Sequence, residues 1–437
     1  MNAQADTTSL VGIVVQTITE LPRIFTGQAS NTTVVVVASG LFGVAAGLVG
    51  VFALMRKRSL TADAIGHATL PGVAGAFIVG TMLGLPLREG PWLLVGAAVA
   101  GAIGAWLIQL IAHRTRLNED AAIGIVLSVF FGVGVVLLGV VQNMESGTQG
   151  GLSTFIFGHT ASMLAADAKS MAIIALFVLF VTLALRKQLT LVCFNDTYAR
   201  ATGWPVQFVD LLLLGLIILV SVAGLRAVGL LLVVAMIAIP AAAARFWSDH
   251  LGRIIAISAV IGGVAGSLGA AVSALAPGRP AGAVIVLTAG TLFAFSMLCA
   301  PRRGLIAGAI VRVRSRLTIL SDHTIETLWE RSEEGTSPDM GPVRELPGGL
   351  RGKVVFLLLR LRGYVQSLGS AYALTPAGMA EGARLSRNHR LWSAYLTTHA
   401  DIAPSHVDWS VDQVEHVLSD ELVRTLERIV QLEDERA

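Results

Sequence analysis

The sequence predicts an all-α polytopic membrane protein that carries a separate, more polar domain at its C-terminal end. Of its 437 residues, 54% are hydrophobic and 14% are charged, and the mean hydropathy is +0.71. Apolar runs of about 20 residues, the length that crosses a hydrocarbon layer of about 30 Å, recur as far as residue 300. Beyond Pro301 charged residues return, which indicates a soluble tail.

Hydropathy predicts about nine transmembrane helices, at residues 33–55, 60–85, 91–112, 119–141, 170–186, 207–226, 228–247, 252–275 and 281–300. Basic residues follow alternate crossings, for example Arg56 and Arg58 after the first and Arg302 and Arg303 after the last. By the positive-inside rule these loops are cytoplasmic, so we expect the N-terminus outside the cell membrane and the tail in the cytoplasm. Arg226 is the exception, because this arrangement places it on the outer side.

The remaining bulk features narrow the class further. Residues 1–32 form an N-terminal segment without a signal-peptide pattern, and residues 9–25 are expected to lie along the membrane surface. Cys193 and Cys299 are far apart, which suggests neither a disulfide framework nor a thiolate metal site. The net charge of +3 argues little for nucleic acid. Glycines spaced along the apolar segments let helices approach closely, which indicates a packed bundle.

One ionisable pair lies inside a predicted span. Asp63, His67 and Pro71 follow each other at intervals of four, on one face of a helix. Charged groups in an apolar helix are costly unless they serve a pathway or each other. Because Pro71 has no N–H to donate, it frees the carbonyl of His67. Oxygen and imidazole ligands suit a divalent cation such as Mn²⁺ or Zn²⁺, and the alternative is an Asp and His that only bond each other.

Two enzyme patterns are missing from the sequence. An intramembrane metalloprotease would carry H-E-x-x-H, in which a general-base Glu stands beside a metal ligand. Neither this pattern nor the phosphate-binding G-x-x-x-x-G-K-[ST] occurs. We therefore expect no enzyme activity from this chain, and any ATP that drives it would be hydrolysed by a partner subunit.

A short helix is predicted in the loop at residues 191–206. Asn195 or Asp196 can cap a stretch that reaches Thr202, and Gly203 followed by Pro205 ends it. A capped helix on the cytoplasmic face is what a permease needs to dock an ATPase. The alternative is an ordinary turn between two membrane helices.

At this point the sequence resembles the permeases of the metal-ion ABC importers for manganese, zinc and iron. The similar stretches are D-A-I-G-H-A-T-L-P-G-V-A at 63–74, E-D-A-A-I-G-I-V at 119–126, A-R-A-T-G-W-P-V at 199–206 and L-R-A-V-G-L-L-L-V-V-A-M-I-A-I-P-A-A-A-A-R at 225–245. The resemblance implies a homodimer that pairs with two ATP-binding subunits and takes its metal from an extracytoplasmic binding protein. It also implies that Asp63 and His67 are ligands in the translocation path. The coupling residues would be Asn195, Asp196, Arg200 and Gly203.

The tail contains a second set of candidate metal ligands. Asp412, Glu415 and His416 stand at i, i+3 and i+4, so one cation can face all three, and His389 lies upstream. The alternative is a solvated helix face. The tail resembles the diphtheria-toxin-repressor and manganese-regulator family, in which a winged helix precedes a helical domain. The similar stretches are Y-A-L-T-P-A-G-M at 372–379, R-N-H-R-L-W at 387–392 and V-E-H-V-L-S-D-E-L at 414–422.

That resemblance implies regulatory ligands at His389, Asp412, Glu415 and His416, with His323 and Glu326 in a first helix. His323 departs from the residue type usual there. DNA binding is not favoured, because residues 352–365, where a recognition helix belongs, are mostly apolar. We expect instead a sensor that binds Mn²⁺ or Fe²⁺ and inhibits uptake.

The sequence thus predicts the membrane subunit of a divalent-metal importer. Mn²⁺ is the expected metal, since the candidate ligands of the tail are rich in carboxylate and lack thiolate, which favours Mn²⁺ over Zn²⁺. Residues 33–300 would form the permease, 301–320 a linker and 321–437 a cytoplasmic winged-helix regulator. Two alternatives stay open, a membrane-tethered DNA regulator and a permease for a metal chelate.

Overall fold

The computed structural model describes residues 30–56, 58–84, 92–144, 165–227, 229–275, 281–333, 350–368, 371–399 and 423–426, and the single residues 12, 15, 19 and 23. The chain divides into two compact units, Met1–Ala307 and Gly308–Ala437, and each is described by itself. Most of the predicted surface helix at residues 9–25 lies outside the described residues.

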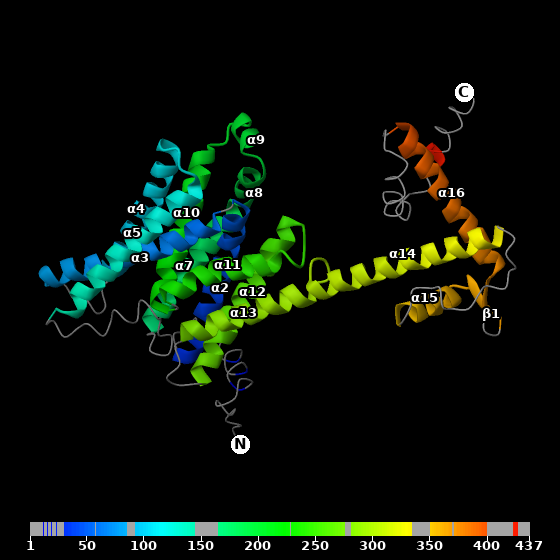
Figure 1. Cartoon of the computed structure of the whole chain (residues 1–437). Coiled ribbons are helices and arrows are strands. Elements are labelled where there is room, and N and C mark those ends of the chain that lie inside the picture. Colours follow the sequence, from blue (N-terminus) through cyan, green and yellow to red (C-terminus); the bar gives the residue numbers. More distant parts are fainter. Residues whose placement is uncertain are drawn as a thin grey trace, which may run out of the picture. The chain divides into compact units, whose positions relative to one another are not determined.

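The first unit is a bundle of helices (Figure 1). Its members are α2 (Asn31–Met55), α3 (Ser59–Met82), α4 (Trp92–Arg114), α5 (Glu119–Gln142), α7 (Ala165–Ala184), α8 (Arg186–Phe194), α9 (Asp196–Ala201), α10 (Val206–Ala227), α11 (Leu230–Ala244), α12 (Leu251–Leu275) and α13 (Ala281–Cys299). Each of the nine predicted crossings coincides with one of these helices. Within the described residues seven helices are long and apolar enough to cross a membrane, and α7 with α8, bent by 63°, would make an eighth.

Helix α11 differs from the other predicted crossings. Its 15 residues rise about 22 Å, which is short of the hydrocarbon thickness. Met236, Ile237 and Ala241 on α11 are almost fully buried. Hydropathy registers such a helix as a span, because a helix buried among other helices is as apolar as one that faces lipid.

The centre of the bundle is α2, which approaches α12 backbone to backbone at facing glycines. A Cβ added to Gly43 would overlap the carbonyl oxygen of Gly262, and a Cβ on Gly262 would overlap that of Gly43. The Ser258 hydroxyl donates to the Gly47 carbonyl at 2.8 Å and joins the same two helices. Helices approach this closely only where the facing residues are small.

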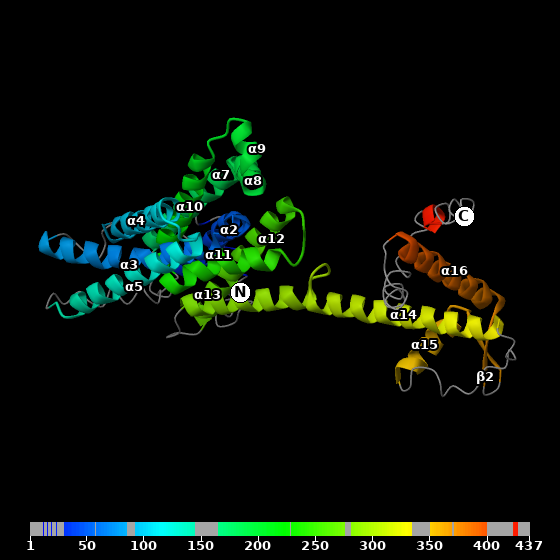
Figure 2. The same cartoon turned by 45° about the horizontal axis from the view of Figure 1, so that its top comes forward.

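A second layer consists of α3, α4 and α5, which lie side by side in Figure 2. Gly72 on α3 meets Gly96 on α4 backbone to backbone, and Gly134 on α5 lies against Leu70 and Pro71 of α3. Pro71 is accommodated inside α3. These contacts fix α3, the helix with the ionisable pair, against its two neighbours.

The second unit contains α14 (Leu305–Glu333), α15 (Leu350–Leu361), the strands β1 (Val365–Leu368) and β2 (Ala371–Leu374), and α16 (Pro376–His399). The strands pair antiparallel, with Val365 opposite Leu374, and this hairpin stands where the sequence predicts a wing. The Thr375 hydroxyl accepts from the Gly378 amide and caps α16, whose first residue is Pro376. Residues 305–320, in the expected linker, belong to the continuous helix α14.

The core of this second unit is small. Its buried members are Ile325, Val355, Phe356, Leu359, Val365 and Leu385. They come from α14, α15, β1 and α16, and together with the close packing of Gly382 against Trp329 this core brings α14 and α16 together. That packing determines where the polar side chains of these two helices meet.

Candidate functional sites

The ionisable pair on α3 is formed within one helix. Asp63 and His67 lie one turn apart, and His67 Nε2 is 3.5 Å from Asp63 Oδ1. The side chain of Asp63 is 35% exposed and that of His67 is 15% exposed. A carboxylate on a membrane helix with a third of its surface uncovered requires a polar path or another protein surface beside it.

The imidazole of His67 is held by an aromatic neighbour. The ring of Phe131, on α5, meets it edge to face, with the ring centroids 5.2 Å apart. Nδ1 of His67 is buried with no hydrogen-bond partner in the described part of the chain. A buried imidazole nitrogen without a partner has a lone pair or a proton to offer, so hydrogen bonds within the described chain do not use up this imidazole.

The predicted loop helix is α9. The Asn195 side chain caps it by accepting from the Tyr198 amide at 2.9 Å, and Gly203 ends it with a φ of +82°. Arg200 is exposed and stands on the last turn. Asp196, predicted as a coupling residue, accepts a hydrogen bond from Arg56, the residue that follows α2, and its side chain is 40% exposed.

Exposed aromatic side chains surround this loop helix, a feature that the sequence reading did not single out. Phe194 is 68% exposed, Tyr198 56% and Trp204 42%. Large aromatic side chains contribute strongly to protein interfaces, because each buries much area and loses little conformational entropy. The surface formed by Phe194, Tyr198, Arg200 and Trp204 is called the α9 surface below.

Arg56 and Asp210 form the centre of a charged cluster where several helices end. Both Nη atoms of Arg56 are used: Nη2 donates to the two oxygens of Asp210 at 2.8 and 2.6 Å, and Nη1 donates to Asp196. Burial lowers the pKa of the Arg56 guanidinium, but Asp210 and Asp196 outweigh burial and keep this pKa above its ordinary value. The sequence reading missed Asp210, although a carboxylate in an otherwise apolar span was a signal for it.

Three of the predicted tail ligands converge in the second unit. Glu326 lies between two imidazoles: its Oε2 is 3.9 Å from Nδ1 of His323, and its Oε1 is 3.8 Å from Nδ1 of His389. The Glu326 side chain is only 10% exposed. Asp412, Glu415 and His416 lie outside the described residues. Among the residues that are described, no group of three or more His, Cys, Asp or Glu side chains is arranged to hold a metal ion.

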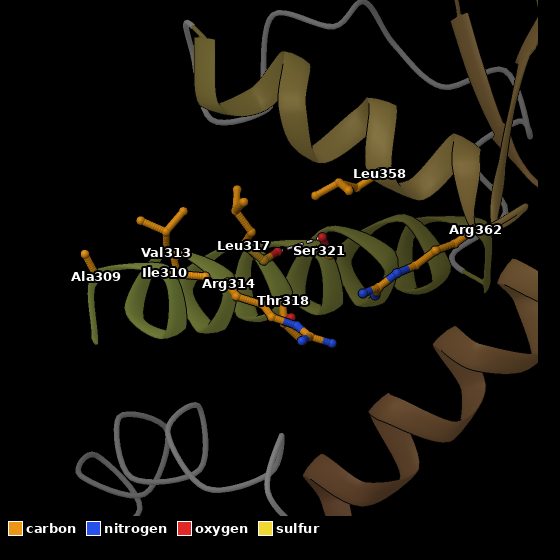
Figure 3. A pocket seen from close by; sticks show the side chains of 9 residues that line it. All are labelled: Ala309, Ile310, Val313, Arg314, Leu317, Thr318, Ser321, Leu358 and Arg362. Atoms are coloured by element: carbon orange, nitrogen blue, oxygen red, sulfur yellow. Dashed lines mark hydrogen bonds between the residues drawn. The ribbon is translucent and has the colours of Figure 1, made fainter. Parts of the chain in front are cut away.

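The surface of α15, where a recognition helix would lie, is largely aliphatic. Leu357 is 57% exposed and Leu361 75% exposed, beside the basic residues Lys353 and Arg360. Between α15 and α14 lies a groove of about 450 Å³ (Figure 3). Its lining is Ala309, Ile310, Val313, Arg314, Leu317, Thr318, Ser321, Leu358 and Arg362. An aliphatic surface of this kind offers few groups that could read base edges.

The fold and these sites define a polytopic helical membrane protein of the permease type with a repressor-like tail. Residues 28–300 match the model of the ABC 3 transport family. Residues 375–432 match the iron dependent repressor, metal binding and dimerisation domain. The chain therefore belongs to the ABC 3 transport family, and its tail carries a repressor-type metal-binding domain.

Individual relatives agree with this assignment. The manganese transport system membrane protein MntC of Bacillus subtilis is 37% identical over 380 residues, 86% of each chain. The zinc transport system membrane protein TroC of Treponema pallidum is 36% identical over 62% of this chain and 90% of its own. In the solved structure of PsaBC from Streptococcus pneumoniae in complex with Fab, a chain that is 32% identical superposes with a TM-score of 0.55. The match covers 66% of the present chain and 97% of that chain.

Proposed function

We propose that this chain is the membrane permease of an importer that moves a divalent transition metal, foremost Mn²⁺, into the cytoplasm. The observation that carries the proposal is the Asp63 and His67 pair, which holds coordinating capacity inside a membrane helix. Relatives named for manganese and zinc transport support the same class of substrate. One carboxylate and one imidazole suit both Mn²⁺ and Zn²⁺, and the relative named for manganese transport, which matches 86% of this chain, places Mn²⁺ first.

The site is completed by a second copy of the chain. One protomer supplies two side chains, whereas Zn²⁺ and Mn²⁺ sites use about four to six ligands. In a homodimer a two-fold axis would bring the same pair from the partner. The exposed part of Asp63 supports this arrangement, since the partner would cover a carboxylate that lipid cannot solvate.

Two further partners follow from this role. An ATP-binding subunit would dock on the α9 surface, whose exposed aromatic side chains suit a protein interface. Asn195 and Gly203 would fix the ends of the docked helix. An extracytoplasmic protein would deliver the metal. We place the protein in the cytoplasmic membrane, with the N-terminus outside and the tail in the cytoplasm.

The tail, residues 321–437, would act as a metal sensor that inhibits uptake. Glu326 lies within 4 Å of His323 through one carboxylate oxygen and within 4 Å of His389 through the other, so three of the predicted ligands are neighbours, and a cation would need further ligands to complete its site. We propose that Asp412, Glu415 and His416 supply the remaining ligands and that the regulatory ion is Mn²⁺ or Fe²⁺. The aliphatic surface of α15 speaks against operator DNA as the partner.

The test is the metal content of cells that express the whole transporter with the native chain, Asp63→Ala or His67→Ala. Asp120→Ala is the matched control, because Asp120 is an exposed carboxylate at the start of α5. Both path variants should lose accumulation of one metal, and the control should retain it. Normal accumulation by the path variants would refute the site and favour transport of a chelate, which needs no protein ligands at this position.

A further inference from the structure

The charged cluster at the ends of α2 and α10 reaches more elements than its central ion pair. Asp196, on α9, accepts from Arg56. Arg58 Nη2 lies 3.4 Å from Asp210, and Arg58 Nε lies 3.5 Å from Glu119. The cluster therefore joins the loop helix α9 to the ends of α2, α10, α3 and α5.

Two of these helices carry the groups around the proposed metal path. Arg58 immediately precedes α3, and Asp63 follows five residues later, about 7.5 Å along the helix. Glu119 is the first residue of α5, the helix whose Phe131 packs on the imidazole of His67. Arg58 thus stands at the start of α3, which carries Asp63 and His67, and contacts the first residue of α5, which packs on His67.

Because the cluster is buried, its ion pairs are expected to add little to the net stability of the fold. The side chains of Arg58, Arg56 and Asp210 are 9%, 13% and 18% exposed. Buried ion pairs contribute little net stability, yet removing one partner is costly because it leaves an uncompensated charge. Such a cluster either keeps one arrangement or changes to another complete one, and discrete arrangements are what a mechanical link between two sites needs.

The cluster also contains two N–H groups that donate no hydrogen bond within the described residues. Nε of Arg56 and Nη1 of Arg58 are buried without an acceptor in the described part of the molecule. In a different arrangement of the same side chains these N–H groups can bond carboxylates that now bond other nitrogens. A second arrangement is therefore chemically available without new residues.

We propose that the cluster of Arg56, Arg58 and Asp210 is the link through which movement of α9 changes the position of α3 and α5 around Asp63 and His67. These three are positioning residues, and they do not touch the metal. The proposal rests on the proposed function, because it assigns α9 to an ATPase and the pair to the path. Its effect is to make metal release depend on ATP hydrolysis.

The test uses the complete transporter, with its ATP-binding subunit and binding protein, in liposomes. Uptake of radiolabelled Mn²⁺ and ATP hydrolysis are measured together for the native chain and Asp210→Asn. We expect hydrolysis to continue while Mn²⁺ uptake per ATP falls by at least about tenfold, the size of a typical coupling between two sites. Hydrolysis and uptake that fall in proportion would overturn the proposal.

Asp249→Asn is the matched control. Asp249 also pairs with two arginines, Arg302 at 3.2 Å and Arg303 at 2.6 Å, but it is 47% exposed and contacts neither α3 nor α9 in these pairs. It should keep the native uptake per ATP. An equal loss in Asp249→Asn and Asp210→Asn would overturn the proposal, because any paired carboxylate would then have the same effect.

A second variant covers the case in which Asp210→Asn does not fold. Asp196→Asn removes the negative charge from the contact between α9 and Arg56, at a side chain that is 40% exposed, and leaves Asp210 in place. It should lower uptake per ATP by a smaller factor, and an unchanged ratio would overturn the proposal. Asp63→Ala distinguishes failure of the proposed link from failure of the proposed metal path. If this variant transports Mn²⁺ normally, the path is wrong, independent of the result for Asp210→Asn.

Discussion

The two groups of candidate metal ligands are built in different ways. In the membrane unit Asp63 and His67 stand on consecutive turns of one helix, 3.5 Å apart. In the tail Glu326 on α14 lies near His389 on α16, and the two residues meet because tertiary packing brings those helices together. One group exists wherever α3 is helical, and the other exists only while the tail is folded.

On the proposed function, this difference suits a path and a sensor respectively. The two ligands within one helix keep their spacing while α3 moves as a unit, which suits an ion that is passed on. A site shared by two helices gains affinity when they come together, so the ion stabilises that arrangement by differential binding. The two groups can be separated experimentally: one group is mutated, and the property assigned to the other group is measured.

The largest effect is expected for His67→Ala. Mn²⁺ uptake should fall by at least about tenfold, since even outer groups of a metal site are worth that much. The stabilisation of the tail by Mn²⁺ should stay native, as followed by hydrogen exchange of residues 350–368. A loss of both properties would mean that the two groups are not independent.

A smaller effect is expected for Leu359→Ala in the tail core. Leu359 is fully buried, so the tail should lose about 2–5 kcal/mol in its free energy of unfolding. Inhibition by high Mn²⁺ should weaken while uptake at low Mn²⁺ continues. Leu357→Ala, at a side chain 57% exposed on the same helix, is the control and should unfold like the native chain in denaturant titrations. Loss of uptake would show that the path depends on the folded tail.

The smallest effect is expected for Glu326→Gln. At a Mn²⁺ concentration about 100 times the dissociation constant, binding stabilises a native tail by about 2.7 kcal/mol, and the variant should lose most of this. Thermal unfolding of the purified chain with and without Mn²⁺ measures the difference. Glu330→Gln changes an exposed carboxylate on the same helix and should respond as the native chain does. An unchanged Mn²⁺ response of Glu326→Gln would remove this residue from the sensor.

Features that depend on neighbouring residues were predictable from the sequence. The period of the helix predicts the approach of Asp63 and His67, and the cap of α9 at Asn195 follows from its residue type. The hairpin before α16 and the helices at the nine apolar segments likewise stand where the sequence places them. All of these features are fixed by interactions within a few turns of chain.

Features that join distant segments were not predictable in the same way. Arg56 and Asp210 are 154 residues apart, and no local sequence pattern predicts that these two residues pair. The proximity of His389 to Glu326 came from family resemblance, since no spacing rule connects α14 with α16. Hydropathy also could not distinguish the short interior helix α11 from a full span, because both are uniformly apolar.

The contact between α2 and α12 has a consequence for how the bundle can move. Gly43 and Gly262 meet backbone to backbone, so a shift of either helix along the other would break this close contact. We therefore expect α2 and α12 to move as one rigid pair. Spin labels on α2 and α12 should keep one distance through every nucleotide state.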